Sequence, residues 1–597
     1  MPAKSPVDIS DPILSVTVSI NGTAVSDIYP LLSVNIIHEV NRIPYAELVY
    51  ADGKLDDGAF PISDSTDFVP GNLIEIKASF TSVPASVFKG YIVKQGIRIN
   101  PSSPNNVVVI CKHKAVALTY NKTEAEFSGK TDSDIISSIV GTYGLSATVD
   151  ATSVTQETVF QKLATDWDFI LSRAQLYGYI ITFNGDDITI GAPKTSAAAV
   201  LYIAAGDSIL TFNADVNAEK QAPDISATAW DIKNQVLLST TATEPAVNEQ
   251  GNLTAKTLSG KLGQKTLTLN SCTPMAEDEL KAWANGTLSR MRLSAIKGDV
   301  SFLGSELVLP GNIIELANVG KRFNGNAFVT SVNHIIEDGE WTTYIKFGLD
   351  NIAVSEFSDF SYPAAAGQLP AINGLQVGTV KKLFDDPEGQ YRVLVNLISN
   401  ATTQDGVWAR MANFYATSSS GAGFMPEVGD EVVIGFLESN PRYPVILGSL
   451  YSNAKQSPCP AADNNNYIKS LTTKSKLKIS FDDEKKITKI ETPGANSIML
   501  SDDAKSIEIV DQNGNSIKMT SDGIVLKSGK DITLDATGNI TLKATGKIAV
   551  TATQDAAISG MNITNTAEMG FTAKGNATAE ISAAGQTTVK GGIVMIN

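Results

Sequence analysis

The sequence predicts a mainly β chain with two β-barrel domains that carry α/β insertions, an OB-fold barrel, and a C-terminal trimeric, intertwined β-helix. Three observations indicate this fold class. Residues 531–554 consist of three successive octads, one seven-residue phrase occurs near residue 70 and again near residue 310, and strand-like runs separated by turn signals fill residues 374–455. At 597 residues the chain is also too long for one hydrophobic core, so several domains are expected.

Residues 1–115 are predicted to form the first β-barrel. Residues 14–20 alternate apolar and polar side chains, which is the period of a strand, and residues 107–110 are a continuous apolar run. Residues 116–225 are predicted as an α/β insertion, because helical spacing of apolar residues occurs at 131–144 and again at 165–178. Thr165 and Asp168 have the spacing of a capping box at the start of the second helix.

Residues 226–357 are predicted as the second β-barrel, with a third helix at about 274–293. The repeated phrase connects the two barrels, because Pro70-Gly-Asn-Leu-Ile-Glu-Ile76 recurs as Pro310-Gly-Asn-Ile-Ile-Glu-Leu316. Two interpretations are open at this point. The phrases are either unrelated strands entered by similar turns, or parts of two related barrels in one chain.

Two linkers flank the predicted OB-fold. Residues 358–373 are rich in Pro, Ala, Gly and Ser, and residues 456–473 are predicted as a second linker or neck. The barrel between them, residues 374–455, is predicted from short strands with turn signals. The candidate strands are 376–380, 391–398, 431–436 and 445–450.

Residues 474–597 are predicted to form the needle, with a charged, irregular section from about Lys474 and a regular one after Ser521. A fixed short period is typical of a solenoid. The predicted needle core consists of the apolar residues that fall in register in the octads: Ile532, Leu534, Ile540, Leu542, Ile548 and Val550. Because Ala, Thr and Gly dominate this region, one chain buries little apolar area and leaves two strand edges unpaired. Three chains around one axis solve both problems, and a single-chain β-helix is the alternative.

Composition argues against several classes of protein. The net charge of −16 disfavours a nucleic-acid binder. The three cysteines are far apart in sequence and do not form a disulfide framework. No secretory signal and no long apolar run is visible, so the chain is expected to be made in the cytoplasm without a signal peptide.

The sequence predicts no catalytic, cofactor-binding or metal site. His38-Glu39 begins a zinc-protease motif, but Arg42 stands where the second histidine belongs. Asp166 and Asp168 lie at a helix start, where carboxylates favour the local dipole, so an acid–base role is not expected. The chain is therefore predicted not to be an enzyme and to need no cofactor.

Four segments in order resemble one family. Residues 165–178 closely resemble a helix of phage baseplate-hub and late-control proteins, and residues 331–334 followed by 341–343 resemble the end of the second hub barrel. The order of hub, OB-fold and rod is similar to that of the VgrG spike of type VI secretion and of the spike of phage-tail-like extracellular injection particles. Residues 34–70 are more similar to the extracellular particles.

The resemblance implies a homotrimeric spike and central baseplate hub of a contractile injection machine. Two hub barrels per chain would let a threefold needle dock under a sixfold tube, and the needle would pierce the target-cell envelope mechanically. The implied partners are inner-tube or hub-adaptor proteins, other baseplate components, a PAAR-like tip protein and effector cargo, with no nucleic acid. The implied location is an extracellular or cell-associated phage-tail-like particle.

The end of the sequence is more apolar than the rod before it. A surface for the tip protein is predicted there, at Gly592, Ile593, Val594, Met595, Ile596 and Asn597. The alternative is a final strand sealed within the trimer. Two other functions are kept as rivals: a tail spike with lytic or polysaccharide-degrading activity, and a trimeric adhesin.

Overall fold

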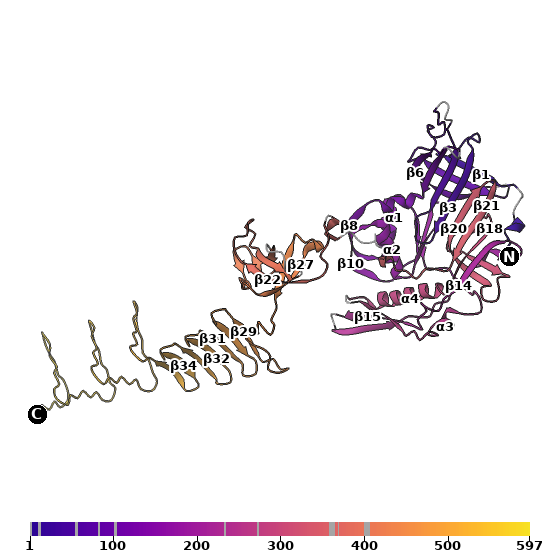
Figure 1. Ribbon diagram of the computed structural model, residues 1–597. Coiled ribbons are helices and arrows are strands. Elements are labelled where there is room, and N and C mark those ends of the chain that lie inside the picture. The colour runs from indigo at the N-terminus through magenta and orange to yellow at the C-terminus, as the bar shows by residue number, and fades with distance from the viewer. Residues whose placement is uncertain are drawn as a thin grey trace. The chain divides into compact units, whose positions relative to one another are not determined.

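The computed structural model describes residues 3–596 except 10–12, 54–57, 82–83, 101–103, 232–233, 272–273, 357–363, 368 and 399–405. The chain forms two compact units, Met1–Leu450 and Tyr451–Asn597, and each is described by itself (Figure 1). The predicted mainly β fold is confirmed. Residues 358–363 and 368 of the linker predicted at 358–373 lie outside the described residues, as does Asn597.

One 13-stranded sheet forms the main body of the first unit. Strands β3 and β20 pair antiparallel, as Figure 1 shows, and this pairing joins strands from the two predicted barrels into the same sheet. The two hub barrels are therefore not confirmed as separate closed barrels. The strands are β1 (Ser15–Ile20), β2 (Thr23–Ala24), β3 (Leu31–Glu39), β4 (Tyr45–Ala51), β5 (Leu73–Ser79), β6 (Ala85–Arg98), β7 (Asn106–Lys112), β13 (Ala199–Ala204), β14 (Ile209–Val216), β18 (Ile296–Leu303), β19 (Ile313–Ala317), β20 (Gly325–Glu337) and β21 (Glu340–Phe347).

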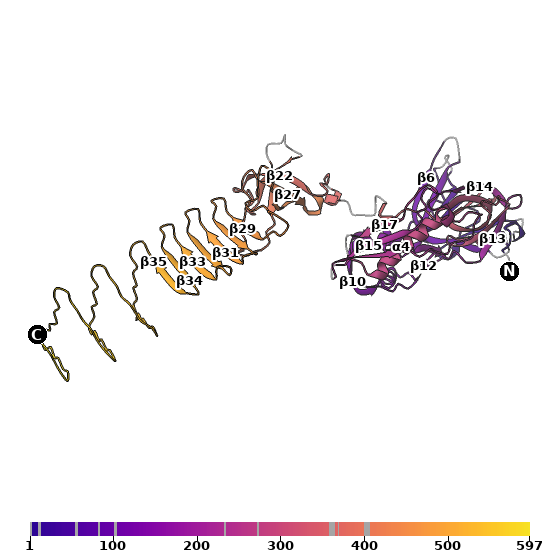
Figure 2. The ribbon, with the colours of Figure 1, turned by 90° about the horizontal axis from the view of Figure 1, so that it is seen from below.

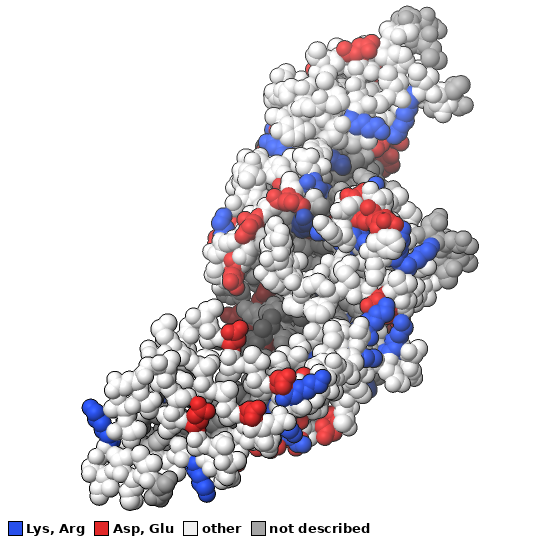
Figure 3. All heavy atoms as spheres, turned by 90° about the vertical axis from the view of Figure 1, so that its left-hand side faces the viewer, with Lys and Arg blue, Asp and Glu red and all other residues white. Residues whose placement is uncertain are grey.

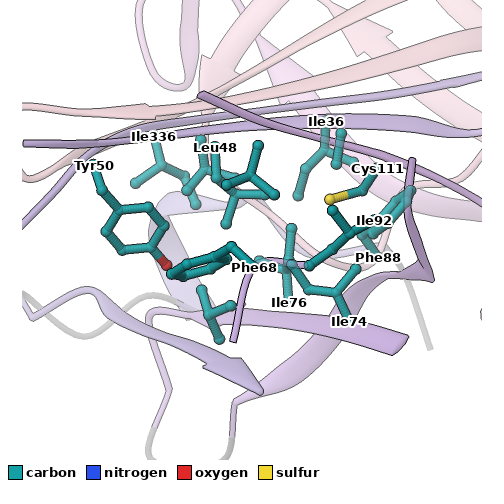
Figure 4. Close-up of a cluster of buried hydrophobic side chains, with 14 of the residues drawn as sticks. Ile36, Leu48, Tyr50, Phe68, Ile74, Ile76, Phe88, Ile92, Cys111 and Ile336 are labelled. Carbon is teal, nitrogen blue, oxygen red and sulfur yellow. The ribbon is translucent and has the colours of Figure 1, made fainter. Parts of the chain in front are cut away.

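Side chains along the strands of this sheet alternate between buried and more exposed positions. The buried ones form a dense apolar core on one face of the sheet. In Figure 4 the side chains from several strands point toward one another around Phe68 and Cys111. Phe68, Ile36 and Leu48 are completely buried. Burying an aliphatic or aromatic side chain of this size stabilises a fold by about 1.5–3 kcal/mol. This unit therefore carries its own core.

The predicted helices at 131–144 and 165–178 are confirmed as α1 (Asp132–Thr142) and α2 (Asp166–Leu176). The backbone N–H of Asp168 donates to Oγ1 of Thr165 over 3.0 Å, so the predicted cap is present. Arg173 of α2 donates to the buried Asp132 of α1 over 2.5 Å, which ties the two helices together. The neighbouring elements are η1 (Val7–Ile9), η2 (Lys114–Thr119), β8 (Lys122–Thr131), β9 (Ala147–Val149), β10 (Thr155–Thr165), β11 (Ile180–Asn184) and β12 (Asp187–Gly191).

The third predicted helix is α4 (Glu277–Leu293), which lies on a small separate sheet. Leu280, Ala284 and Leu288 of α4 are fully buried and pack against Ala227 and Ala229 of that sheet. The sheet and the adjoining helix consist of β15 (Ile225–Asp231), β16 (Val236–Thr241), β17 (Leu267–Ser271) and α3 (Ala255–Leu258). The domain boundaries given above for residues 116–357 stay predictions.

The two copies of the repeated phrase have the same local structure. Gly71 and Gly311 both adopt positive φ, 104° and 91°, which favours glycine. Gly71 N–H donates to the carbonyl of Ile92 and Gly311 N–H to that of Val329, both over 2.8 Å. The phrases then enter β5 and β19, which pair antiparallel with the long strands β6 and β20. The similar turns and strand pairings favour the interpretation that the two phrases belong to related structural units, rather than to unrelated strands.

Residues 376–449 contain a closed five-stranded barrel, as the OB-fold prediction requires. Val393, Val395 and Ile434 are completely buried inside it. The four predicted strands are present, whereas β24 was not predicted. The elements of this region are η3 (Val354–Glu356), η4 (Ala364–Gly367), β22 (Gln376–Lys382), β23 (Val393–Leu397), β24 (Val407–Met411), β25 (Ala416–Thr417), β26 (Ser420–Gly421), β27 (Glu431–Phe436), η6 (Leu437–Ser439) and β28 (Pro444–Ser449).

The second unit begins with a seven-stranded antiparallel sheet in simple sequence order. The prediction of an irregular section between Lys474 and Ser521 is wrong, because regular five-residue strands occupy it. The strands are β29 (Ile468–Thr472), β30 (Lys478–Asp482), β31 (Ile487–Glu491), β32 (Ser497–Ser501), β33 (Ser506–Val510), β34 (Ser516–Thr520) and β35 (Gly523–Lys527). Within the described residues beyond β35, no strand pairs inside the chain.

Candidate trimer interface of the needle

A repeat of 19 residues builds the seven-stranded sheet. Thr473, Thr492 and Asp511 begin equivalent turns, in each of which the first residue's N–H donates to the carbonyl four residues on. Each turn places its fourth residue, Lys476, Ala495 or Gly514, at positive φ. A turn that recurs unchanged returns every strand in the same register. Equivalent side chains therefore stack above one another along the sheet.

One face of this sheet carries two apolar ladders. Ile498 lies opposite Ile490 on one side and Ile509 on the other. The first ladder contains Leu471, Ile479, Ile490, Ile498, Ile509, Ile517 and Leu526, and the second contains Phe481, Thr488, Leu500, Ile507, Met519 and Ile524. Period-two alternation places these residues on a single face. We call this surface the ladder face.

The ladder face is open in the single chain. Ile498, Leu500 and Ile509 are 40%, 47% and 40% exposed. A hollow of about 630 Å³ lies over this surface and is lined by Ile490, Ile498, Ile509 and Ile517 among others. Contiguous exposed apolar surface of this kind marks an interaction site.

The opposite face of the same strands is mainly polar. Lys478 lies 3.5 Å from Glu491, and Lys489 and Glu491 are 2.5 Å apart. Glu508 and Lys518 form a further pair at 3.8 Å on neighbouring strands. Ion pairs this exposed contribute little stability, so this face is built for contact with water. The sheet is amphipathic, with one face that needs a cover.

The described part of the needle beyond Lys530 forms no strands of its own. Figure 2 shows the chain beyond β35 running back and forth in wide turns without neighbouring strands. Within the described part, residues 531–596, no hydrogen bond forms inside the chain. The predicted core residues are all exposed here: Ile532 by 58%, Leu534 by 67%, Ile540 by 53%, Leu542 by 69%, Ile548 by 56% and Val550 by 81%. Both backbone and side chains are left without partners in the single chain.

The predicted tip residues lie at the end of this segment. Ile593, Met595 and Ile596 are 85%, 84% and 91% exposed, and Val594 is 48% exposed. Asn597 lies outside the described residues. The apolar side chains are available for contact, and their role as a tip surface stays a prediction.

Sequence reasoning missed the ladder face because the repeat there is longer than the octad. Ile479, Ile498 and Ile517 recur every 19 residues, and Phe481, Leu500 and Met519 do the same. The second set keeps only apolar character, so identity at the repeat is weak. A search for a period in hydropathy, rather than in residue type, would have detected it.

Two further observations concern other kinds of site. Among the described residues, no group of three or more His, Cys, Asp or Glu side chains is placed to hold a metal ion. No helix in the described part of the chain has the length and apolar character needed to cross a membrane. On the face drawn in Figure 3, cationic and anionic side chains are interspersed.

Three family models match the chain. The "Alg8 N-terminal domain" model matches residues 10–338, the "Type VI secretion system/phage-baseplate injector OB domain" model residues 376–451, and the "Phage baseplate V C-terminal trimerisation domain" model residues 486–537. The second and third matches, with the relatives described next, confirm the predicted resemblance to VgrG-like spike and phage-baseplate proteins. Because the first match spans more than half of the chain, the chain belongs to the Alg8 N-terminal domain family.

Curated relatives are similar over short stretches. The spike protein VgrG1b of Pseudomonas aeruginosa is 25% identical over 130 residues, which is 20% of this chain and 18% of that protein. The spike protein VgrG3 of Vibrio cholerae is 28% identical over 102 residues, 16% of this chain and 10% of that protein. The "Actin cross-linking toxin VgrG1" of Vibrio cholerae is 28% identical over 96 residues, 15% and 9% of the two chains. The chain thus spans less than a fifth of the length of each.

Solved structures give distant likenesses. A tail protein from Neisseria meningitidis aligns with a TM-score of 0.42 and 12% identity, covering 58% of this chain and 99% of that chain. The E. coli c3393 protein, a component of the type VI secretion system, aligns with a TM-score of 0.37 and 12% identity, covering 72% and 99% of the two chains.

Proposed function

We propose that this chain is the trimeric spike and central baseplate hub of a contractile injection machine. The observation that carries the proposal is the segment 531–596, which holds an extended path without one hydrogen bond inside the chain. Ordering a residue costs about 1–2 kcal/mol of conformational entropy. No contact within one chain offsets that cost, so neighbouring chains must supply the partners.

Three copies meet this need. In an intertwined β-helix, the strand edges of residues 531–596 pair with the edges of two other chains, and Ile532, Leu534, Ile540, Leu542, Ile548 and Val550 share one thin core. The ladder faces of three seven-stranded sheets then close around the same axis. The trimerisation-domain match over residues 486–537 covers most of the seven-stranded sheet and the first residues of the segment 531–596, and it supports this arrangement.

The experiment is the solution mass of the full-length chain by light scattering. We expect three times the 63.2 kDa of one chain. Ile498→Asp places a carboxylate on the ladder face and is expected to abolish the trimer, because buried charges without partners are strongly destabilising. Met499→Asp changes the neighbouring residue on the opposite face and is the matched control. A monomeric wild-type chain, or equal masses for the two variants, would contradict the proposal.

We propose further that the hub docks the threefold needle under a sixfold tube. The matching turns at Gly71 and Gly311 support this role, because they provide two similar units per chain and six per trimer. Inner-tube or adaptor proteins and other baseplate components would bind there. Cryo-electron microscopy of the trimer is the test, and sixfold pseudo-symmetry of the hub is the expected result.

At the other end, residues 592–597 are proposed to bind a PAAR-like tip protein. The exposure of Ile593, Met595 and Ile596 supports the proposal. Deleting residues 592–597 should abolish tip-protein pull-down while the trimer remains. Unchanged binding would show that the apolar end has another purpose, such as a final strand sealed in the trimer.

The proposed action is mechanical: the needle concentrates the force of contraction on the target-cell envelope, with effector cargo carried by the particle. We propose no catalytic role and no cofactor, and a location in an extracellular or cell-associated phage-tail-like particle. A relative named as an actin cross-linking toxin makes an enzymatic rival worth testing. Release of sugar or peptidoglycan fragments by the purified trimer would favour a lytic spike over a mechanical one.

A further inference from the structure

We propose that a hairpin of the OB barrel, residues 412–428, binds the OB barrel of a second copy of this chain. The hairpin connects β24 to β27. It contains the short pair β25–β26, in which Thr417 lies opposite Ser420, and Ala422 N–H donates to the carbonyl of Tyr415 over 2.9 Å. The hairpin is thus an ordered element. The inference rests on the trimer proposed above.

The hairpin exposes a group of large apolar side chains. Phe414, Tyr415, Phe424, Met425 and Val428 are 89%, 56%, 51%, 41% and 60% exposed. They are not needed to fill the barrel, whose core is already closed by other residues that are almost completely buried. Exposed aromatic side chains are typical of interface anchors. The hairpin therefore requires a partner outside its own barrel.

Charge and tethering favour a second copy as that partner. Glu427 is the one charged residue of the hairpin, and residues 412–426 contain no Lys, Arg, Asp or Glu, so hairpins from several copies of an acidic chain can meet with little repulsion. Residues 450–467 join the barrel to the first strand of the needle sheet. A segment of that length reaches about 60 Å at most. In a trimer, the barrels are therefore confined near one another at high effective concentration.

Photo-cross-linking of the full-length protein tests the inference. Phe414 is replaced by p-benzoylphenylalanine, and Thr379, which is exposed on β22 of the same barrel, is replaced in a matched control. We expect cross-linked dimers and trimers on a denaturing gel from position 414, with peptides from residues 374–451 of another copy, and none from position 379. Adding Tyr415→Ser and Phe424→Ser should remove the cross-links.

The mass of the same samples separates the two proposals. A monomeric mass would refute the trimer, and the hairpin inference with it. A trimeric mass with cross-links confined to one chain, absent, or equally strong from position 379 would overturn the hairpin inference alone. Circular dichroism of the Tyr415→Ser, Phe424→Ser chain checks that the barrel remains folded.

Discussion

The two units of this chain differ in how they bury their apolar side chains. Residues 3–450 contain every hydrophobic cluster found in the described structure, with side chains such as Phe68 and Val393 completely buried. In the described residues beyond Ile446, no apolar side chain is buried. The first unit can therefore fold as a single chain. In the second unit, the apolar side chains that could form a core are exposed instead. The difference indicates that the second unit depends on other chains for burial, whereas the first does not.

Within the second unit a finer comparison applies. The seven-stranded sheet satisfies its backbone inside the chain and lacks only a cover for its ladder face. Residues 531–596 lack backbone partners as well. The dependence on other chains thus increases along the needle. Each of the following predictions perturbs one of the regions compared here.

The largest effect is expected in amide hydrogen exchange of the Ile498→Asp chain. If this variant is monomeric, residues 531–596 should lose all protection, because no hydrogen bond forms there inside the chain. The seven-stranded sheet should keep partial protection, and the first unit should exchange as in the wild type. Uniform loss of protection across the chain would refute the division into a self-sufficient first unit and a needle that depends on other chains. Met499→Asp is the control.

A smaller effect is expected for Leu542→Ala. If the octad core is shared by three chains, each copy loses about 2–5 kcal/mol of burial, and the loss occurs three times in one trimer. Resistance of the trimer to heat in detergent should fall clearly. Lys543→Ala alters the next residue, which the strand period places on the other face, and should leave it unchanged. Similar effects of the two substitutions would argue against an octad core.

The stability of the first unit should depend on pH through histidines that the needle does not contain. Burial lowers the pKa of His334 to about 3 and that of His113 to about 4, from an ordinary 6.5, and lowers the pKa of His38 as well. Since the unfolded chain takes up these protons first, stability is full above pH 6.5 and is lost as the pH falls from 6.5 toward 3. All three histidines belong to the first unit.

The measurement is the denaturation midpoint of the first unit as a function of pH, followed by tryptophan fluorescence. All five tryptophans also lie in the first unit, so the signal reports on that unit alone. His334→Gln should reduce the slope between pH 6.5 and 4. A midpoint independent of pH in that range would contradict the prediction.

The smallest effect is expected on the polar face of the needle sheet. Glu508 and Lys518 form an exposed pair at 3.8 Å, and such pairs contribute about 0–1 kcal/mol. Lys518→Ala should leave the trimer and its melting temperature almost unchanged. A large loss would show that this face is covered in the assembly rather than open to water.

Sequence patterns predicted the helices well because the determinants are local. Thr165 and Asp168 form the expected cap, and the apolar stripe of α4 is buried as its spacing indicates. Strand β24 was missed because Ala409 is its only buried residue, so it shows no alternating pattern. The pairing of β3 with β20 could not be predicted, since it joins segments far apart in the chain and no local signal specifies it.

For the needle, sequence identified the dependence on partners but not the whole surface. The octads are conspicuous because residue identity repeats, whereas the ladder face repeats only in hydropathy. The exposure of the octad core residues agrees with a core shared between chains. The missing information is the position of the other chains, which a single chain does not contain.

The place of the unpaired segment in the chain has a consequence for biosynthesis. Domains fold as units during translation, with those nearer the N-terminus first. The hub and the OB barrel precede residues 531–596, so both can be complete before the ribosome releases any open strand edge. Open edges are an aggregation hazard. Translating them after the self-sufficient domains shortens the time for which a nascent chain displays them, and leaves the meeting of three finished chains as the step that closes the needle.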